Sequence, residues 1–270
     1  MSFLILVLFL SSVCLAQDEP EQEVGGFSLV QYGDSGEKKW EMKGKSAELE
    51  DNDVKVNEIS ALSFEQDQVL KLKAKEGSFD RKEGMVHLSE NVVLKTTDGT
   101  ALRTDSLDWD TETRSASTDE AVNIKKADFE VTGKGGALDL EQETAEIMED
   151  VIANIASPET GILRDTGYGI RDTVITCDGP LELNYNTNRA TFQNNVEVKD
   201  VEGNIFADRI DVYFNPGSKR VKCVVARGNV RIINGENVTY SEKAIYLVDE
   251  GRVILPKRPR LVIQNTNGHE

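Results

Sequence analysis

The sequence predicts an all-β protein built of stacked β-layers. Apolar and polar residues alternate strictly in many short segments, the period-2 pattern of half-buried strands, and no long stretch has helical periodicity. The alternating segments also recur with a period of about 30 residues, which is typical of layered architectures in which each unit buries its apolar face against its neighbours.

Each repeat contains the same parts in the same order. A strand such as LDW, LDL, LEL or IDV leads into a polar turn, and a second strand then ends in a turn directly before a valine. Asn and Gly suit such turns because they tolerate positive φ. The residues before the valines are Asn91, Ala121, Asp150, Asn195 and Asn229, separated by 30, 29, 45 and 34 residues.

The long interval of 45 residues contains an insert that divides the chain in two. Residues 156–171 read ASPETGILRDTGYGIR, with one proline and three glycines, and the charge balance changes there. Residues 1–155 contain 16 basic and 33 acidic residues, whereas the remainder contains 15 of each. We therefore expect a first β-domain at 38–155, an insert or hinge at 156–172, a second β-domain at 173–264 and a tail at 265–270.

The N-terminus predicts export. Residues 3–10 read FLILVLFL, and the apolar stretch is short for a membrane span but typical of a signal peptide. Small residues at Cys14 and Ala16 predict cleavage after Ala16, so that 1–16 is a signal peptide and 17–37 a polar linker. Two alternatives stay open: an uncleaved short anchor, and a lipoprotein cysteine at Cys14.

Cleavage would leave two cysteines, Cys177 and Cys223. In an exported protein they either form a disulfide or remain separate small residues in strands. We favour the second interpretation, because a single pair of cysteines is a weak signal.

Composition and motifs exclude several function classes. The net charge of −17 argues against nucleic acid and against anionic lipid head groups. Nucleophile, zinc and phosphate-loop motifs are missing, and His87 is interpreted as a surface strand residue. Asp108 and Asp110 belong to the outward face, so we interpret them as solvated charge rather than as a glycosidase pair. We expect no enzyme, no cofactor and no metal.

One face of the predicted strands is apolar along the chain, and the opposite face, with Asp139 and Asp211, is charged. Val221, Cys223 and Val225 are expected to share a face. We expect a uniform lining without a polar position. Its candidate residues are Leu107, Trp109, Leu138, Leu140, Ile147, Val151, Leu181, Leu183, Tyr185, Phe192, Val196, Val198, Ile210, Val212, Phe214, Val221, Val230 and Ile232. Such an interior is either filled by its own side chains, as in a structural or adhesive β-solenoid, or partly open to an apolar ligand.

Ordered motifs connect the chain to a known family. A Trp-led first strand at Trp40 is followed by LKAKEG, LRTDSLDWD and GKGGALDL, and residues 38–155 thereby resemble the periplasmic lipopolysaccharide-transport protein LptC. The motifs ADRIDVYF and ARGNVRI, within 174–263, resemble the OstA-like domain of LptA.

The resemblance implies a stacked antiparallel β-jellyroll, or β-taco, with open ends. It implies a periplasmic bridge component, exported and either free or anchored in the inner membrane, that binds lipopolysaccharide acyl chains in an apolar groove. Its implied partners are lipopolysaccharide, an inner-membrane ABC transporter and other lipopolysaccharide-transport proteins joined by edge-to-edge strand pairing. Residues 40–49 and 253–263 would offer the two edges.

Overall fold

The computed structural model describes residues 22–262, except for 34, 51–52, 66–67, 81, 127–128, 157–171, 201–202, 218–219 and 257. Within these residues the chain is all-β and antiparallel, which confirms the predicted fold class, and seventeen strands belong to one sheet. The predicted signal peptide and the tail lie outside the described residues. The prediction of a linker at 17–37 was wrong for residues 22–32, which form the first strand of the sheet. In the described part, no helix is long and apolar enough to cross a membrane.

The strands are numbered in chain order. They are β1 (Gln22–Tyr32), β2 (Lys38–Glu50), β3 (Asp53–Glu65), β4 (Gln68–Asp80), β5 (Met85–Thr96), β6 (Ala101–Asp110), β7 (Ser115–Lys126), β8 (Phe129–Asp139), β9 (Thr144–Ala156), β10 (Asp172–Cys177), β11 (Leu181–Asn184), β12 (Arg189–Asp200), β13 (Gly203–Phe214), β14 (Val221–Asn234), β15 (Asn237–Leu247), β16 (Arg252–Ile254) and β17 (Arg260–Val262).

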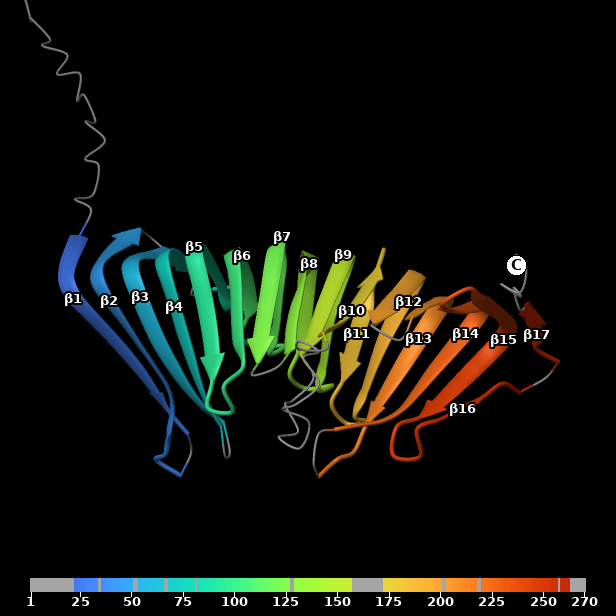
Figure 1. Ribbon diagram of the computed structural model, residues 1–270. Helices are drawn as coiled ribbons and strands as arrows, with labels where there is room; N and C mark the ends of the chain where they lie inside the picture. Colours follow the sequence, from blue (N-terminus) through green and yellow to red (C-terminus); the bar gives the residue numbers. More distant parts are fainter. Residues whose placement is uncertain are drawn as a thin grey trace, which may run out of the picture.

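The sheet is a meander in which each strand pairs with the next along the chain (Figure 1). β10 and β11 together occupy one position, because both pair with β9 on one side and with β12 on the other. At the C-terminal end, β16 and β17 both pair with β15. The two expected β-domains therefore form one continuous sheet, although the insert 157–171 lies outside the described residues.

The repeated valines mark bends within strands. The strand continues through the bend in β5, β9, β12 and β14. In each of these strands the residue before the valine has a positive φ, which ranges from 48° at Asn229 to 57° at Asn91. The prediction that a strand ends there was wrong, because one or two residues at positive φ produce a bulge that kinks the strand without ending it. The valines at the bends are Val92, Val122, Val151, Val196 and Val230, all between 0% and 3% exposed.

The predicted polar turns lie at the opposite ends of the strands. The side chain of Asp110 accepts hydrogen bonds from the backbone N–H groups of Glu112 (2.8 Å) and Thr113 (3.1 Å). A hydrogen bond from the Thr113 side chain, together with these two backbone bonds, lowers the pKa of the Asp110 carboxyl. Asp80 and Asp139 cap their turns in the same way. Each repeat therefore closes with the same local hydrogen bonds.

The buried residues form two clusters rather than one. The first contains residues of β2 to β6, and the second contains residues of β8 to β15. Between them lie Thr104 and Thr118, which are buried with their hydroxyl oxygens 3.3 Å apart. The β6–β7 ladder also stops at Arg103 and resumes only at Asp108. The expectation of a lining without a polar position was wrong at this place, which we call the β6–β7 seam.

Candidate functional site

Two rows of side chains cross the sheet perpendicular to its strands. Residues in register on neighbouring antiparallel strands point to the same face, so each row forms a stripe on one face. The first row is Leu49, Val54, Phe79, Val86, Trp109, Ala116, Leu138, Ala145, Leu183, Ala190, Val212, Val224, Tyr246 and Val253. Every member carries an apolar or aromatic side chain.

The second row lies on the other side of the bends. It consists of Met42, Ala61, Leu72, Leu94, Leu102, Ile124, Val131, Ala153, Ile175, Val198, Ile205, Ile232, Thr239 and Leu261. Only Thr239 is polar. Both rows pass from β9 to β12 without interruption, by way of β11 in the first row and β10 in the second.

The two rows face one another across a trough. Ala190 and Val212 of the first row belong to the same buried cluster as Val131 and Ala153 of the second row. Floor residues such as Phe192 and Val196 belong to the same cluster, so both rows and the floor between them lie on one side of the bent sheet. The floor and part of each row are buried, with Phe192 on the floor 2%, Ala190 3% and Ala153 0% exposed. Other row members, such as Leu183 and Val198, are half-buried, and we call these the rims.

Most predicted lining residues lie in this trough. The fully buried ones are Leu107, Ile147, Val151, Leu181, Phe192, Val196, Ile210, Val212 and Val230. Those half-buried and packed against a cluster are Trp109, Leu183, Val198, Phe214, Val221 and Ile232. Leu138 is half-buried within the first row.

Leu140 and Tyr185 lie outside the rows, just past the ends of β8 and β11. The side chain of Asn184 accepts the backbone N–H of Thr187 at 2.8 Å, so the alternation of the strand ends there. Tyr185 is 57% exposed, yet burial and the Asp98 carboxylate raise the pKa of its hydroxyl, so its place in the lining stays a prediction.

Sequence reasoning missed the lining of the first strands. Leu49, Val54, Phe79 and Val86 all belong to the first row, yet no residue before Leu107 was predicted. The same period-2 alternation is present in the segments around Leu72 and Leu88 and would have identified them.

The faces of β14 differ from the expectation. Cys223 and Val225 are in register with Tyr213 and Asp211, on the face opposite the trough, whereas Val221 packs against the core. A register shift after Tyr213 puts Val221 on the trough side, so the predicted common face of these three residues was wrong. Cys177 is buried in the core, and both Cys177 and Cys223 are free.

Asp211 is buried rather than solvated, which corrects another expectation. It is 0% exposed, and its carboxylate accepts hydrogen bonds from Thr191 Oγ1 (2.9 Å) and from Arg209 Nε (3.0 Å) and Nη2 (2.9 Å). Arg227 Nη1 donates to the second oxygen of this carboxylate. A buried carboxylate is tolerable only when paired in this way.

The remaining candidates for chemistry are structural. His87 is exposed, as predicted, and its Nδ1 lies 2.6 Å from Asp108 Oδ1. Among the described residues, no group of three or more His, Cys, Asp or Glu side chains could hold a metal ion. A cleft of about 450 Å³ lies where the two parts join, and Ala116, Leu138, Ala145 and Leu183 are among its lining residues.

These features define a class of antiparallel β-jellyroll proteins folded around a continuous apolar lining. Residues 7–156 match the family model described as lipopolysaccharide-assembly, LptC-related, and the chain belongs to this family. Residues 179–269 match the model described as LptA/(LptD N-terminal domain) LPS transport protein. The chain thus joins two modules of the lipopolysaccharide-transport system in the order that its motifs indicate.

Comparison with solved structures found a similarity to LptH from Pseudomonas aeruginosa, described as the LptA homologous periplasmic component of the lipopolysaccharide transport device. The identity is 14%, the TM-score is 0.33, and the match covers 62% of this chain and 96% of that chain. No curated protein matches the sequence.

Proposed function

We propose that the trough binds lipopolysaccharide acyl chains and passes them toward the outer membrane, as part of a periplasmic bridge. The observation that carries this proposal is the pair of apolar rows, which continue across the junction of the LptC-like and LptA-like parts. An acyl chain held between them would stay out of water over the whole length of the sheet.

The energetics favour sliding over trapping. Each CH₂ group removed from water contributes about 0.8 kcal/mol, and similar side chains repeat in each strand of both rows. Neighbouring positions along the trough are therefore nearly equal in free energy, so a chain moves without meeting one deep well. Direction comes from an inner-membrane ABC transporter that loads further lipids at one end.

The sheet edges provide the joints to other transport proteins. β1 offers a long edge, paired with β2 from Gln22 to Tyr32, whereas the opposite edge consists of the two three-residue strands β16 and β17. The expectation that residues 40–49 form an edge was wrong, because they belong to β2, which pairs with β1 on one side and with β3 on the other. An unpaired edge strand is a natural place for strand addition. Residues 1–16 export the chain, either as a cleaved signal or as a short inner-membrane anchor.

A second candidate is a structural or adhesive β-solenoid without lipid cargo. The complete burial of floor residues such as Leu181 and Ile210, both 0% exposed, favours this alternative because side chains already fill the floor. The two candidates differ in whether the half-buried rims hold an apolar ligand.

Lipid extraction and mass spectrometry of protein purified from its own envelope separate these candidates. Leu183→Arg places a charge in the first row, and its neighbour Glu182→Arg places the same charge on the opposite face. We expect lipopolysaccharide with the unchanged chain and with Glu182→Arg, and a loss of about tenfold or more with Leu183→Arg. Lipid-free protein in all three cases, with folding intact by circular dichroism, would support the solenoid.

A further inference from the structure

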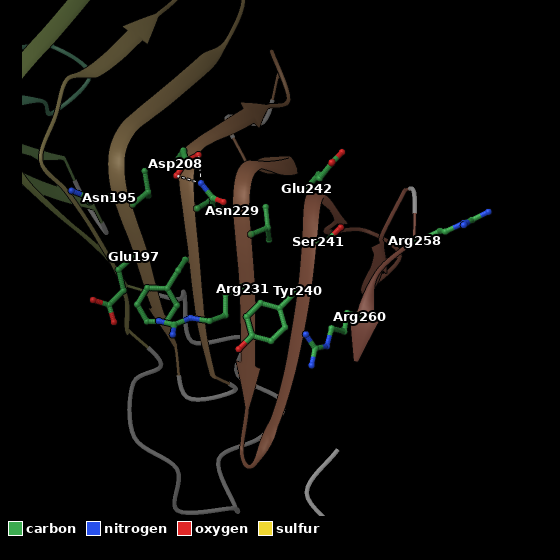
Figure 2. Close-up of a pocket in the computed structure, with 14 residues that line it drawn as sticks. Asn195, Glu197, Asp208, Asn229, Arg231, Tyr240, Ser241, Glu242, Arg258 and Arg260 are labelled. Atoms are coloured by element: carbon green, nitrogen blue, oxygen red, sulfur yellow. Dashed lines mark hydrogen bonds between the residues drawn. The ribbon is translucent and has the colours of Figure 1, made fainter. Parts of the chain in front are cut away.

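The C-terminal strands carry a second groove, on the face opposite the trough. Its volume is about 670 Å³, within the usual range of small-molecule sites, and it extends over β12 to β15 and the start of β17 (Figure 2). Phe206, Arg231 and Tyr240 of this groove alternate along their strands with Ile205, Ile232 and Thr239 of the second row. Because alternate strand residues face opposite ways, the proposed lipid path does not include this groove.

One side of the groove is basic and aromatic. Glu197, Phe206, Arg231, Tyr240 and Arg260 are in register across five strands. The Arg231 guanidinium lies 4.1 Å from the centre of the Phe206 ring, and Tyr240 is 45% exposed between Arg231 and Arg260. In Figure 2 these three labelled side chains lie together, whereas Arg258 is at the outer rim.

The two arginines are available to an anion. Within the described part of the chain, neither Arg231 nor Arg260 forms an ion pair. Glu197, the acidic residue of the same row, is already paired with Lys199 at 3.2 Å. A guanidinium without a carboxylate partner is suited to bidentate binding of phosphate.

The other side of the groove carries amide, hydroxyl and carboxylate groups at the bends. Asn229 Nδ2 donates to both oxygens of Asp208, at 3.2 and 2.9 Å, as the dashed line in Figure 2 marks. Gly228 has φ of 74°, and a Cβ there would lie 2.2 Å from Asp208 Oδ2. The absence of a Cβ at Gly228 therefore leaves room for the Asp208 carboxylate. The side chains of Asp208 and Asn229 thereby lie across the groove from Tyr240 and the arginines.

We propose that this groove binds a phosphorylated saccharide. Arg231 and Arg260 hold the phosphate, and the exposed face of Tyr240 packs against the apolar C–H face of a sugar ring. Asp208 and Asn229 hydrogen-bond the sugar hydroxyls. The combination of unpaired guanidinium groups, an exposed aromatic ring and fixed hydrogen-bonding groups in one groove favours this ligand over an acidic peptide, which would not need the Asp208 carboxylate.

Amide chemical shifts of the ¹⁵N-labelled chain test the proposal, with glucosamine 1-phosphate as the probe. We expect shifts confined to β12–β15 and β17, and binding weakened about tenfold or more in Arg231→Gln/Arg260→Gln, since a hydrogen bond to a charged group is lost. Tyr240→Ala should also weaken binding. The matched control is Arg252→Gln, because Arg252 lies on β16 outside the groove and pairs with Glu250; it should bind as the unchanged chain does.

Three results would overturn the proposal: no shift at millimolar probe, binding of inorganic phosphate as tight as that of the sugar phosphate, or an acidic peptide that binds while the sugar phosphate does not. Intact lipopolysaccharide serves as competitor. Displacement of the probe supports a site for lipid-borne sugars, and binding without displacement supports a site for free sugar phosphates. Since the probe has no acyl chain, this result is independent of whether the trough carries lipid.

Discussion

The two buried clusters of this sheet are built from the same kinds of side chain, yet they are bounded differently. The second cluster continues from Val131 and Ile147 of the LptC-like part into Leu181 and Phe192 of the LptA-like part. The first cluster ends within the LptC-like part, at the β6–β7 seam. The packed core is thus continuous across the boundary between the LptC-like and LptA-like parts, and it is divided within the LptC-like part.

Backbone pairing explains this difference. At the module junction β9 pairs with β11 from Thr144 to Ile147 and with β10 from Val151 to Ala156, so only Met148–Asp150 lie outside the ladder, and apolar partners such as Ala145 and Leu183 meet in register. At the β6–β7 seam the gap is longer, from Thr104 to Leu107 on β6, and two buried hydroxyl groups take the place of apolar contacts. Charge balance and an insert therefore mark the boundary of a sequence module, whereas strand pairing and side-chain polarity mark the boundary of a packed core.

The largest expected effect tests whether the clusters are separate. Phe192→Ala should cost about 3–5 kcal/mol in the second cluster, and the matched Leu88→Ala about 2–5 kcal/mol in the first, through lost packing and a cavity. Because the seam separates them, hydrogen exchange should rise in β8–β15 for Phe192→Ala and in β2–β6 for Leu88→Ala. If either substitution raised exchange equally on both sides, the two clusters would be one cooperative unit.

A somewhat smaller loss of stability is expected from substitutions on the outer face of the sheet, compared between the strands of the second cluster and those of the first. Asp211→Ala leaves Arg209 and Arg227 without their shared carboxylate, and we expect a loss of about 3 kcal/mol, because these partly exposed arginines regain some water. The control is Asp108→Ala in the first region, where both partners of the His87 contact are half exposed and the loss should stay below about 1 kcal/mol. Urea unfolding measures both values, and equal losses would contradict the distinction.

The β6–β7 seam itself allows a double-mutant test. Thr118→Val alone leaves the Thr104 hydroxyl without its partner, at a cost of about 1–3 kcal/mol, whereas Thr104→Val should cost less because Thr118 Oγ1 still accepts the backbone N–H of Glu120 at 3.1 Å. The double variant removes both hydroxyl groups and should cost less than the sum of the two single losses. Additive losses in thermal unfolding would show that these hydroxyl groups do not act as a pair.

The smallest expected effect is a pH dependence within the first region. Partial burial raises the pKa of Asp98, but hydrogen bonds from Lys126, Thr96 and Thr100 outweigh it and hold this pKa well below its usual range. A lowered pKa means that the stabilisation is present above the unfolded-state value of about 3.9 and is lost as the pH falls toward the folded-state value.

Because Asp98 is largely exposed, Asp98→Asn should cost no more than about 1 kcal/mol at pH 7. The difference from the unchanged chain should shrink steadily below about pH 4. Urea unfolding at pH 7 and at lower pH checks this sign, and a difference that grew on acidification would contradict it.

Alternation in the sequence predicted the lining where strands are regular. Leu181 and Leu183, or Ile210 and Val212, occupy the trough side because nothing disturbs the period between them. The bends could not be predicted from the same pattern. A single Asn or Asp at positive φ has the same sequence signature in a turn as in a bulge, and only the pairing of β9 or β12 with both neighbours distinguishes the two.

Other features depend on contacts between strands far apart in sequence. The burial of Asp211 requires arginines from β13 and β14 and a hydroxyl from β12. One register shift puts Val221 on the face opposite that of Cys223, which local alternation does not reveal. The continuity of the trough was hidden because the insert separates β9 from β10 in sequence although they are neighbours in the sheet.

The central claim is that one apolar trough carries lipid through both modules, and site-specific photo-crosslinking tests it most directly. Probes replace Trp109 and Val198, which line the trough on either side of the junction, and their sequence neighbours Asp108 and Lys199, which face outward. In envelopes with active transport, we predict capture of lipopolysaccharide at Trp109 and Val198 and none at Asp108 or Lys199. Equal capture on both faces, or capture in one module only, would contradict the account.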